Sequence, residues 1–226
     1  IYFPNNFFSQ VLGGVHAGIE HNFDGVQKAK YIALFSNLAM PRQTRLNVNY
    51  VRRMQYRFKD TELNGTYDIR INLNSQFSER YQFGTNIGRH VAAVRFLEVP
   101  EEGRLATLGF WIRMQASDRL NVGLSYDSQK MTTMDIETDY FSGYITTLRA
   151  SYQHTKSLGF KVLTQYNDFS KGFQIQPLLT YQPSPFTIFY IGSTSNQNVD
   201  GLAFDNIQNG MLTDRQYFMK IQYLFN

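Results

Sequence analysis

The chain ends in Arg215-Gln-Tyr-Phe-Met-Lys-Ile-Gln-Tyr-Leu-Phe-Asn226, and this stretch decides the fold that we expect. Successive side chains of a β-strand point to opposite faces. On that period one face is apolar and aromatic, and it carries Tyr217, Met219, Ile221, Tyr223 and Phe225. The other face is mostly polar, with two glutamines and a lysine. Strands of transmembrane barrels alternate in this way. We therefore predict that 214–226 is the closing strand of an outer-membrane β-barrel.

The composition favours a wall with one face in lipid and the other in water. Aromatic residues make up 15% of the chain and charged residues 18%, below the roughly 25% of soluble domains. Yet the mean hydropathy is −0.36, and no run approaches the ~20 apolar residues of a membrane helix. A soluble β-sandwich is the alternative, but it does not need so many long alternating stretches. The chain has no cysteine, so disulfide and thiolate chemistry are excluded.

Alternating stretches recur along the whole chain and predict an all-β, antiparallel barrel wall of about twelve strands. The expected strands are 12–22, 29–39, 45–58, 67–74, 81–97, the hairpin 104–129, 143–154, 158–167, 173–182, 185–194 and 214–226. In 81–97 the apolar face changes sides, and we expect a β-bulge at Gly88 to restore it. Arg52 is a misfit, because it falls on an apolar face. We expect it near a membrane interface, or a slip in the alternation there.

The connections alternate in length, as they do in barrels with long outer loops and short inner turns. The long ones are 23–28, 59–65, 98–103, 129–142, 167–172 and 195–213. The short ones are 40–43, 78–80, 116–118, 155–157 and 183–185. This pattern predicts a bacterial outer-membrane location with the C-terminus in the periplasm.

We expect 1–226 to form a single barrel domain, with 1–11 as a partial strand or a plug segment. A truncated thirteenth strand would break the even strand number of closed bacterial barrels. The expectation is therefore the C-terminal part of a larger barrel. A complete twelve-stranded barrel with a short N-terminal plug is the alternative.

Four stretches carry a resemblance to a known group: Tyr140-Phe-Ser-Gly-Tyr144, Leu148-Arg-Ala-Ser-Tyr152, Phe160-Lys-Val-Leu-Thr-Gln-Tyr-Asn167 and Phe218-Met-Lys-Ile-Gln-Tyr-Leu-Phe225. Together, over 140–226, they resemble the C-terminal barrel region of uncharacterised Bacteroidota outer-membrane proteins. In that group the N-terminal domain resembles family 9 carbohydrate-binding modules. The resemblance implies a longer chain with a soluble N-terminal domain. It implies no catalytic residues.

Charge is unevenly placed. The expected long connections hold twelve of the 18 carboxylates, whereas the basic residues alternate inside strands. We predict an acidic rim over a basic, anion-favouring lumen. The candidate pore-lining residues are Arg45, Arg53, Arg57, Arg70, Arg95, Arg113, Arg149 and Lys161. The alternative is that these cations pair with carboxylates on a missing part of the barrel or on a plug. Nucleic-acid binding is not expected, because the basic residues form no patch.

Sites for other chemistry are weak. Asp135, Glu137 and Asp139 could hold a divalent cation, but the stretch lacks a calcium-loop glycine turn, and a solvated loop is the alternative. His154 and Ser151 are the local pair closest to hydrolase chemistry, and alternation puts them on opposite faces. We therefore expect no catalytic residues and no cofactor.

The function that these patterns favour is non-enzymatic. We expect a porin-like solute channel, or a membrane anchor or scaffold for a surface or periplasmic domain and its partner proteins. The expected partners are outer-membrane lipid, the barrel-assembly machinery and other outer-membrane or surface proteins. An outer-membrane-embedded hydrolase of the lipase or protease type is the alternative.

Overall fold

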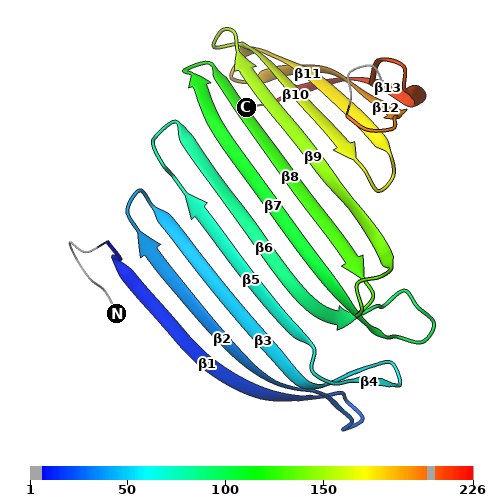
Figure 1. Cartoon of the computed structure of the whole chain (residues 1–226). Coiled ribbons are helices and arrows are strands. Elements are labelled where there is room, and N and C mark those ends of the chain that lie inside the picture. The colour runs from blue at the N-terminus through cyan, green and yellow to red at the C-terminus, as the bar shows by residue number, and fades with distance from the viewer. Residues whose placement is uncertain (1–6, 203–206, 226) are drawn as a thin grey trace. The chain divides into compact units, whose positions relative to one another are not determined.

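The computed structural model describes residues 7–202 and 207–225 (Figure 1). These residues form a 13-stranded sheet in which the long strands follow chain order, and the short β4 pairs with β3. The strands are β1 (Gln10–His21), β2 (Gln27–Met40), β3 (Thr44–Phe58), β4 (Thr61–Leu63), β5 (Tyr67–Ser75), β6 (Tyr81–Ala93), β7 (Glu102–Ser117), β8 (Leu120–Thr132), β9 (Asp139–Gln153), β10 (Leu158–Asn167), β11 (Gly172–Ser184), β12 (Thr187–Asn198) and β13 (Met211–Tyr223).

The predicted all-β, antiparallel class is confirmed, and each predicted strand has a counterpart. β10 has the predicted bounds, while β8 and β9 extend into the stretch 129–142 that we expected to be a loop. The alternation did not reveal β4, which pairs with the end of β3 inside the expected connection 59–65. Three residues are too few to show a period. The partial strand or plug expected at 1–11 lies mostly outside the described residues, and β1 begins at Gln10.

The chain divides into two compact units. The prediction of a single domain stays a prediction. The first unit extends to Phe110 and includes Ser128–Ser142. The second unit contains Trp111–Asp127 and the chain from Gly143 onward.

In the first unit, residues that face each other across β3 and β5 separate an apolar face from a polar one. The apolar rows pair Leu46 with Leu73, Val48 with Ile71 and Tyr50 with Ile69. The rows between them pair Asn47 with Asn72 and Asn49 with Arg70. Directly opposed residues of an antiparallel pair share a face. The sequence alternation therefore corresponds to two chemically different faces, and we call them the apolar face and the polar face.

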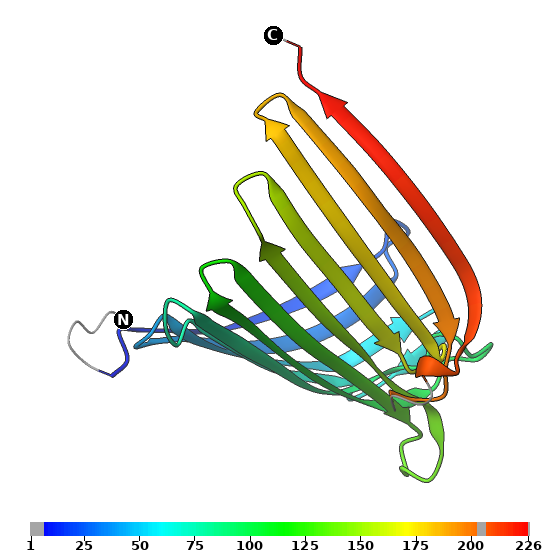
Figure 2. The same ribbon diagram turned by 90° about the horizontal axis from the view of Figure 1, so that it is seen from above.

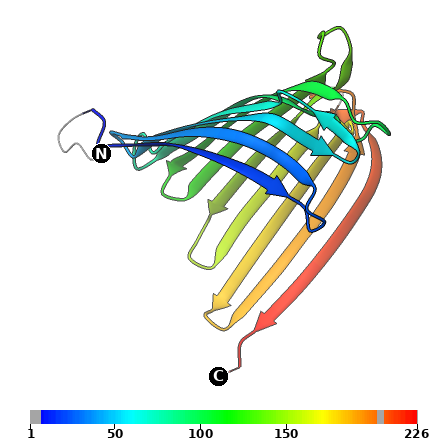
Figure 3. The same cartoon turned by 90° about the horizontal axis from the view of Figure 1, so that it is seen from below.

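In the second unit, β9 to β13 lie side by side in chain order (Figures 2 and 3), and their faces are separated in the same way. One row across these strands is apolar, and it consists of Tyr152, Phe160, Leu179, Ile191 and Met219. A row five residues further along the same strands lies on the other face and is polar, and it consists of Thr147, Gln165, Gln174, Asn196 and Asp214. Of the residues expected to share the apolar side of the last strand, Met219 opposes Ile191 and Ile221 opposes Phe189. Phe225 lies beyond the end of β13.

The bulge expected at Gly88 is wrong. β6 pairs with β5 in unbroken register from Val91 to Phe83, and Gly88 faces Arg70 within it. The strand instead ends at Ala93, so Val94 and Phe96, which with Ala92 suggested a change of face, are not part of the strand. The glycine is instead required by the side chains of His90 and Thr107, which leave no room for a Cβ at this position.

A bulge occurs instead on β3, at Met54. Tyr31 of β2 opposes Arg53, but the next residue, Lys30, opposes Gln55, so Met54 has no partner there. The extra residue moves every later side chain of β3 to the face opposite to the one that regular alternation would give it. Tyr56 therefore shares a face with Arg53. Arg52, the misfit of the sequence, precedes the bulge and stays on the apolar face.

Among the described residues, no helix is long and apolar enough to cross a membrane.

Candidate functional site

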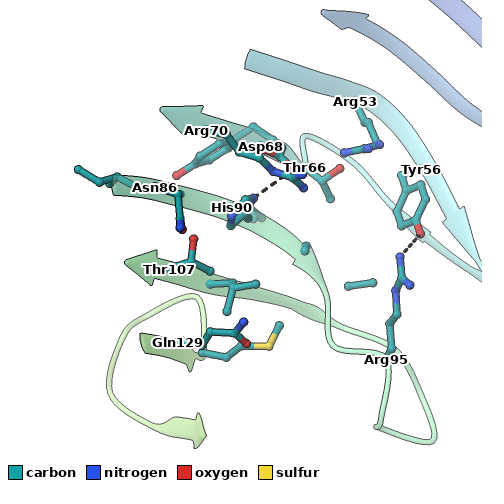
Figure 4. Close-up of a pocket in the computed structure, with 18 of the residues that line it drawn as sticks. Arg53, Tyr56, Thr66, Asp68, Arg70, Asn86, His90, Arg95, Thr107 and Gln129 are labelled. Atoms are coloured by element: carbon teal, nitrogen blue, oxygen red, sulfur yellow. Dashed lines mark hydrogen bonds and ion pairs between the residues drawn. The ribbon is translucent and has the colours of Figure 1, made fainter. Parts of the chain in front are cut away.

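The polar face of the first unit contains a pocket of about 720 Å³ (Figure 4). It lies over β3, β5 and β6 and reaches residues of β7 and β8 in the same unit. The polar side chains that line it include Arg53, Tyr56, Thr66, Asp68, Arg70, Asn72, Asn86, His90, Arg95, Thr107 and Gln129. The pocket is thus built from the polar rows that alternate with the apolar ones.

Asp68 is the electrostatic centre of the pocket. Its Oδ2 accepts a hydrogen bond from the Arg70 guanidinium at 2.6 Å and lies 3.2 Å from Nδ1 of His90. Alternation places Arg70 two residues further on the same face, and the register of β5 and β6 puts His90 directly opposite Asp68. The Asp68 and His90 side chains are 16% and 10% exposed, but Arg70 is 62% exposed. Asp68 is therefore engaged from two sides, while most of the Arg70 guanidinium faces the pocket.

Two further guanidiniums complete the charge of the pocket (Figure 4). The Arg53 Cζ lies 5.7 Å from the centre of the Tyr56 ring, and Arg95 donates a hydrogen bond to the Tyr56 hydroxyl at 3.5 Å. Within the described part of the chain, neither arginine pairs with a carboxylate. Three guanidiniums thus face one carboxylate, Asp68. The pocket carries an excess of positive charge.

Thr66 adds a polar atom at the wall of the pocket. Its side chain is almost fully buried, with 2% of the residue exposed. Its Oγ1 makes no hydrogen bond to any described residue. A buried hydroxyl without a partner costs about 1–3 kcal/mol. The Thr66 hydroxyl is therefore an unsatisfied polar group at the wall of the pocket.

Gly88 allows His90 and Thr107 to approach each other over the strand. A Cβ at this position would lie 2.5 Å from Nε2 of His90 and closer still to Oγ1 of Thr107. Both contacts are too short for any side chain. The glycine is thus explained by a close approach of side chains rather than by a bulge.

The structure brings three of the predicted pore-lining residues, Arg53, Arg70 and Arg95, to one pocket. Arg45 lies on the same polar face, opposite Asn74, but it does not line this pocket. Arg57 follows the bulge, so it leaves that face and pairs with Glu62 at 3.3 Å. A role in lining a pore stays a prediction for all of them.

The other three predicted pore-lining residues belong to the second unit. Arg113 stacks on Trp111, with its Cζ 5.0 Å from the ring centre. Arg149 opposes Leu163 and Lys161 opposes Ser151, and both share the face of Gln165. The structure therefore does not gather these cations at the pocket of the first unit.

Sequence reasoning did not find Asp68, His90, Thr66 or Tyr56. Asp68 carried a signal, because it shares the polar face of one predicted strand with Arg70. His90 carried no such signal in the sequence, since its position opposite Asp68 depends on the register between β5 and β6.

Residues 7–202 and 207–225 contain no group of three His, Asp or Glu side chains that could hold a metal ion. Asp139, one of the weak metal candidates, pairs with Lys130 at 2.9 Å. The Thr133 hydroxyl and the Glu137 backbone N–H donate to Asp135 and hold the pKa of its carboxyl below the usual value. Asp135 is thus engaged within its own loop.

Ser151 and His154, the pair that the sequence offered for hydrolase chemistry, have different neighbours. Ser151 opposes Lys161, while the His154 ring lies 6.1 Å from the Tyr152 ring. Of the histidines, His90 is the one that the described residues pair with a carboxylate, and no described hydroxyl forms a hydrogen bond to it. Among the described residues, the Asp68–His90 pair therefore has no serine or threonine hydroxyl hydrogen-bonded to the imidazole, as a hydrolase nucleophile would be.

A second, smaller pocket lies in the second unit and differs in chemistry. Its volume is about 340 Å³. The side chains that line it are mainly amides and hydroxyls, including Gln165, Asn167, Ser170, Gln174, Asn196, Gln197, Asn198 and Thr213. Gln174 donates a hydrogen bond to the Asn196 amide oxygen at 2.8 Å. No charged side chain of the described residues lines this pocket.

No family model and no curated protein matches the chain. Among solved structures, it is similar to the KdgM porin in complex with disordered oligogalacturonate, with 10% identity, 96% of this chain and 100% of that one covered, and a TM-score of 0.36. It is similar to the NanC porin, with 10% identity, coverage of 95% and 99%, and a TM-score of 0.38. It is also similar to the Ralstonia pickettii toluene transporter TbuX, with 10% identity, coverage of 99% and 79%, and a TM-score of 0.38. At these TM-scores, only the residues of this chain bear on its function.

Proposed function

We propose that this chain is a non-enzymatic outer-membrane β-barrel protein whose polar face lines a path for small anionic solutes. The fold supports the membrane part of the proposal. In both units, rows of apolar side chains alternate with polar rows along registered strands. A transmembrane strand needs this arrangement, because one face meets lipid and the other meets water.

The charge of the first pocket carries the proposal for anions. Arg53, Arg70 and Arg95 contribute three permanent positive charges, and the single lining carboxylate, Asp68, is already engaged by Arg70 and His90. Guanidiniums bind carboxylate and phosphate groups through paired hydrogen bonds. Clustered charges of one sign inside a pore concentrate the opposite ion and set selectivity.

The location that we propose is the bacterial outer membrane, with the C-terminus in the periplasm. The resemblance that we propose between 140–226 and Bacteroidota outer-membrane proteins implies the same location. Lipid and the barrel-assembly machinery would then be the obligatory partners. An anchor or scaffold for a surface or periplasmic domain, working with other outer-membrane or surface proteins, is the version of the proposal without conduction.

The proposal is tested by recording the full chain in planar bilayers under a potassium chloride gradient. We expect discrete conductance with a reversal potential that indicates chloride preference. In the triple variant Arg53→Gln, Arg70→Gln and Arg95→Gln, this preference should fall toward that of a neutral pore. The control is Arg215→Gln, which removes one positive charge from an exposed position of β13 outside both pockets, and it is compared with the single variant Arg70→Gln as well as with the triple variant.

Cation preference in the wild type would refute the anion path. An inserted protein without conductance would refute the channel and leave the anchor or scaffold version.

A further inference from the structure

Two arginines stand on the apolar face of the first unit, on either side of β5. Arg52 of β3 opposes Tyr67, and Arg89 of β6 opposes Ile69. Tyr67 and Ile69 are two residues apart on one strand, so the two arginines lie in adjacent rows of the same face. Both are exposed. Among the described residues, neither forms an ion pair or a side-chain hydrogen bond.

Their neighbours on this face are apolar. Arg52 lies beside Ile32 of β2, and Arg89 lies in a row that also contains Leu34 and Tyr50. Ile32 and Leu34 are themselves 37% and 43% exposed. An unpaired charge is costly at the middle of a lipid layer and costs little near its interface. If this face meets lipid, the two guanidiniums must therefore reach a headgroup region.

The position of Arg52 along β3 agrees with this requirement. At about 3.3 Å per residue, roughly 20 Å of strand separates Leu46, near the turn that precedes β3, from Arg52. The apolar band of outer-membrane barrels is about 25 Å tall and its strands are tilted by about 35–45°. Arg52 thus lies in the part of the band away from that turn, and its long side chain can extend further toward the interface.

We propose that Arg52 and Arg89 bind the phosphate groups of an anionic lipid at this edge of the apolar face. The inference rests on the membrane location proposed above, but not on conduction. A guanidinium is less strongly hydrated than an ammonium and forms bidentate hydrogen bonds to phosphate. The two arginines are separated by two strand spacings, about 10 Å, and by two residues along the strands, about 7 Å, so their Cα atoms lie about 12 Å apart. A lipid that carries two phosphate groups can therefore engage both.

The site is distinct from the pocket. Asp68, Arg70 and His90 belong to the other face of the same strands, because they alternate with Tyr67, Ile69 and Arg89. One pair of strands thus carries a solute-facing set of charges and a lipid-facing set.

The test uses the full chain in detergent and in vesicles. Native mass spectrometry in detergent measures the binding of lipid A, which carries two phosphates, and compares it with phosphatidylcholine. We expect at least tenfold tighter binding of lipid A by the wild type, and a loss of most of this difference in Arg52→Gln with Arg89→Gln. The matched control is Arg45→Gln, on the same strand as Arg52 but on the polar face. It should retain the wild-type preference.

Two further measurements separate the possible failures. Inorganic phosphate at millimolar concentration should not displace lipid A, and full displacement would overturn the lipid assignment in favour of a free-anion site. Insertion into phosphatidylcholine vesicles is scored by resistance to carbonate extraction. If the protein inserts but does not distinguish the two lipids, or if the double variant binds like the wild type, the inference alone is wrong. If the protein does not insert, the membrane location fails first.

Discussion

The two pockets of this chain lie on polar strand faces of the same kind but differ in charge. In the first unit, Arg53, Arg70 and Arg95 surround one engaged carboxylate. In the second unit, amides such as Gln174 and Asn196 bind each other at 2.8 Å. The difference shows that a polar face alone does not define a site for ions. Selectivity should depend on the first pocket, while the second should offer hydrogen bonds to neutral or charged solutes alike.

The largest effect should follow from reversing one charge in the first pocket. Arg70→Glu replaces the guanidinium that contacts Asp68 by a second carboxylate, so two guanidiniums then face two carboxylates and the excess positive charge of the pocket is removed. We expect the reversal potential in a salt gradient to lose most of its anion preference. Gln174→Leu in the second pocket is the comparison, and it should leave ion preference unchanged. Equal shifts in the two variants would remove the distinction between the pockets.

Asp68→Asn should separate the structural role of the charge cluster from its electrostatic role. The amide cannot neutralise Arg70, and the interaction with His90 is weakened, so the free energy of unfolding should fall by about 1–3 kcal/mol. Anion preference should increase, because one negative charge leaves the pocket. Urea unfolding from lipid vesicles measures the first effect and bilayer recording the second. A stable variant with reduced anion preference would contradict the arrangement that we describe.

Gly88→Val should destabilise the first unit through steric overlap. The new side chain would collide with His90 and Thr107, and overpacking of this kind costs about 1–3 kcal/mol. Gly123→Ala is the matched control, because a Cβ there meets its nearest atoms at 3.7 and 3.8 Å, which is ordinary contact. Unfolding midpoints of the two variants, measured side by side, test the explanation. A neutral Gly88→Val variant would show that His90 and Thr107 need not share this space.

The smallest effect concerns the loop between β10 and β11, where the second unit holds a charged pair. Lys171 donates a hydrogen bond to Asp168 at 2.8 Å, which lowers the pKa of the carboxyl from its usual 3.8 and raises the pKa of the amine from its usual 10.5. The carboxylate then stabilises the fold above its unfolded pKa, and this contribution is lost as pH falls through the lower folded value. Lys171→Gln should therefore be slightly less stable than wild type at neutral pH and equal to it in strong acid.

Unfolding curves at neutral and strongly acidic pH, for the variant and the wild type, check this pH dependence. A difference that persists in strong acid would show that Lys171 acts by packing rather than by charge.

The sequence period predicted the strands well, because each strand places chemically different side chains on its two faces. It could not locate β4, whose three residues show no period, nor the bulge at Met54, which depends on pairing with β2. Gly88 shows a further limit. A glycine in a strand indicates either a bulge or a close approach, and only the neighbouring side chains distinguish the two. For the same reason the Arg53, Arg70 and Arg95 cluster was partly predictable, while the contact between Asp68 and His90 was not.

The bulge at Met54 also bears on how this strand can change in length. Removal of one residue from a regular strand moves every later side chain to the opposite face of the sheet. Met54 has no opposing residue in β2, so a chain without it could keep Arg53 opposite Tyr31 and Gln55 opposite Lys30. At this point a one-residue deletion is neutral in the pairing with β2, whereas the register with β5 and β4 runs unbroken past Met54 and would have to shift. The edge of β3 that pairs with β2 therefore tolerates a change in length that the edge pairing with β4 does not.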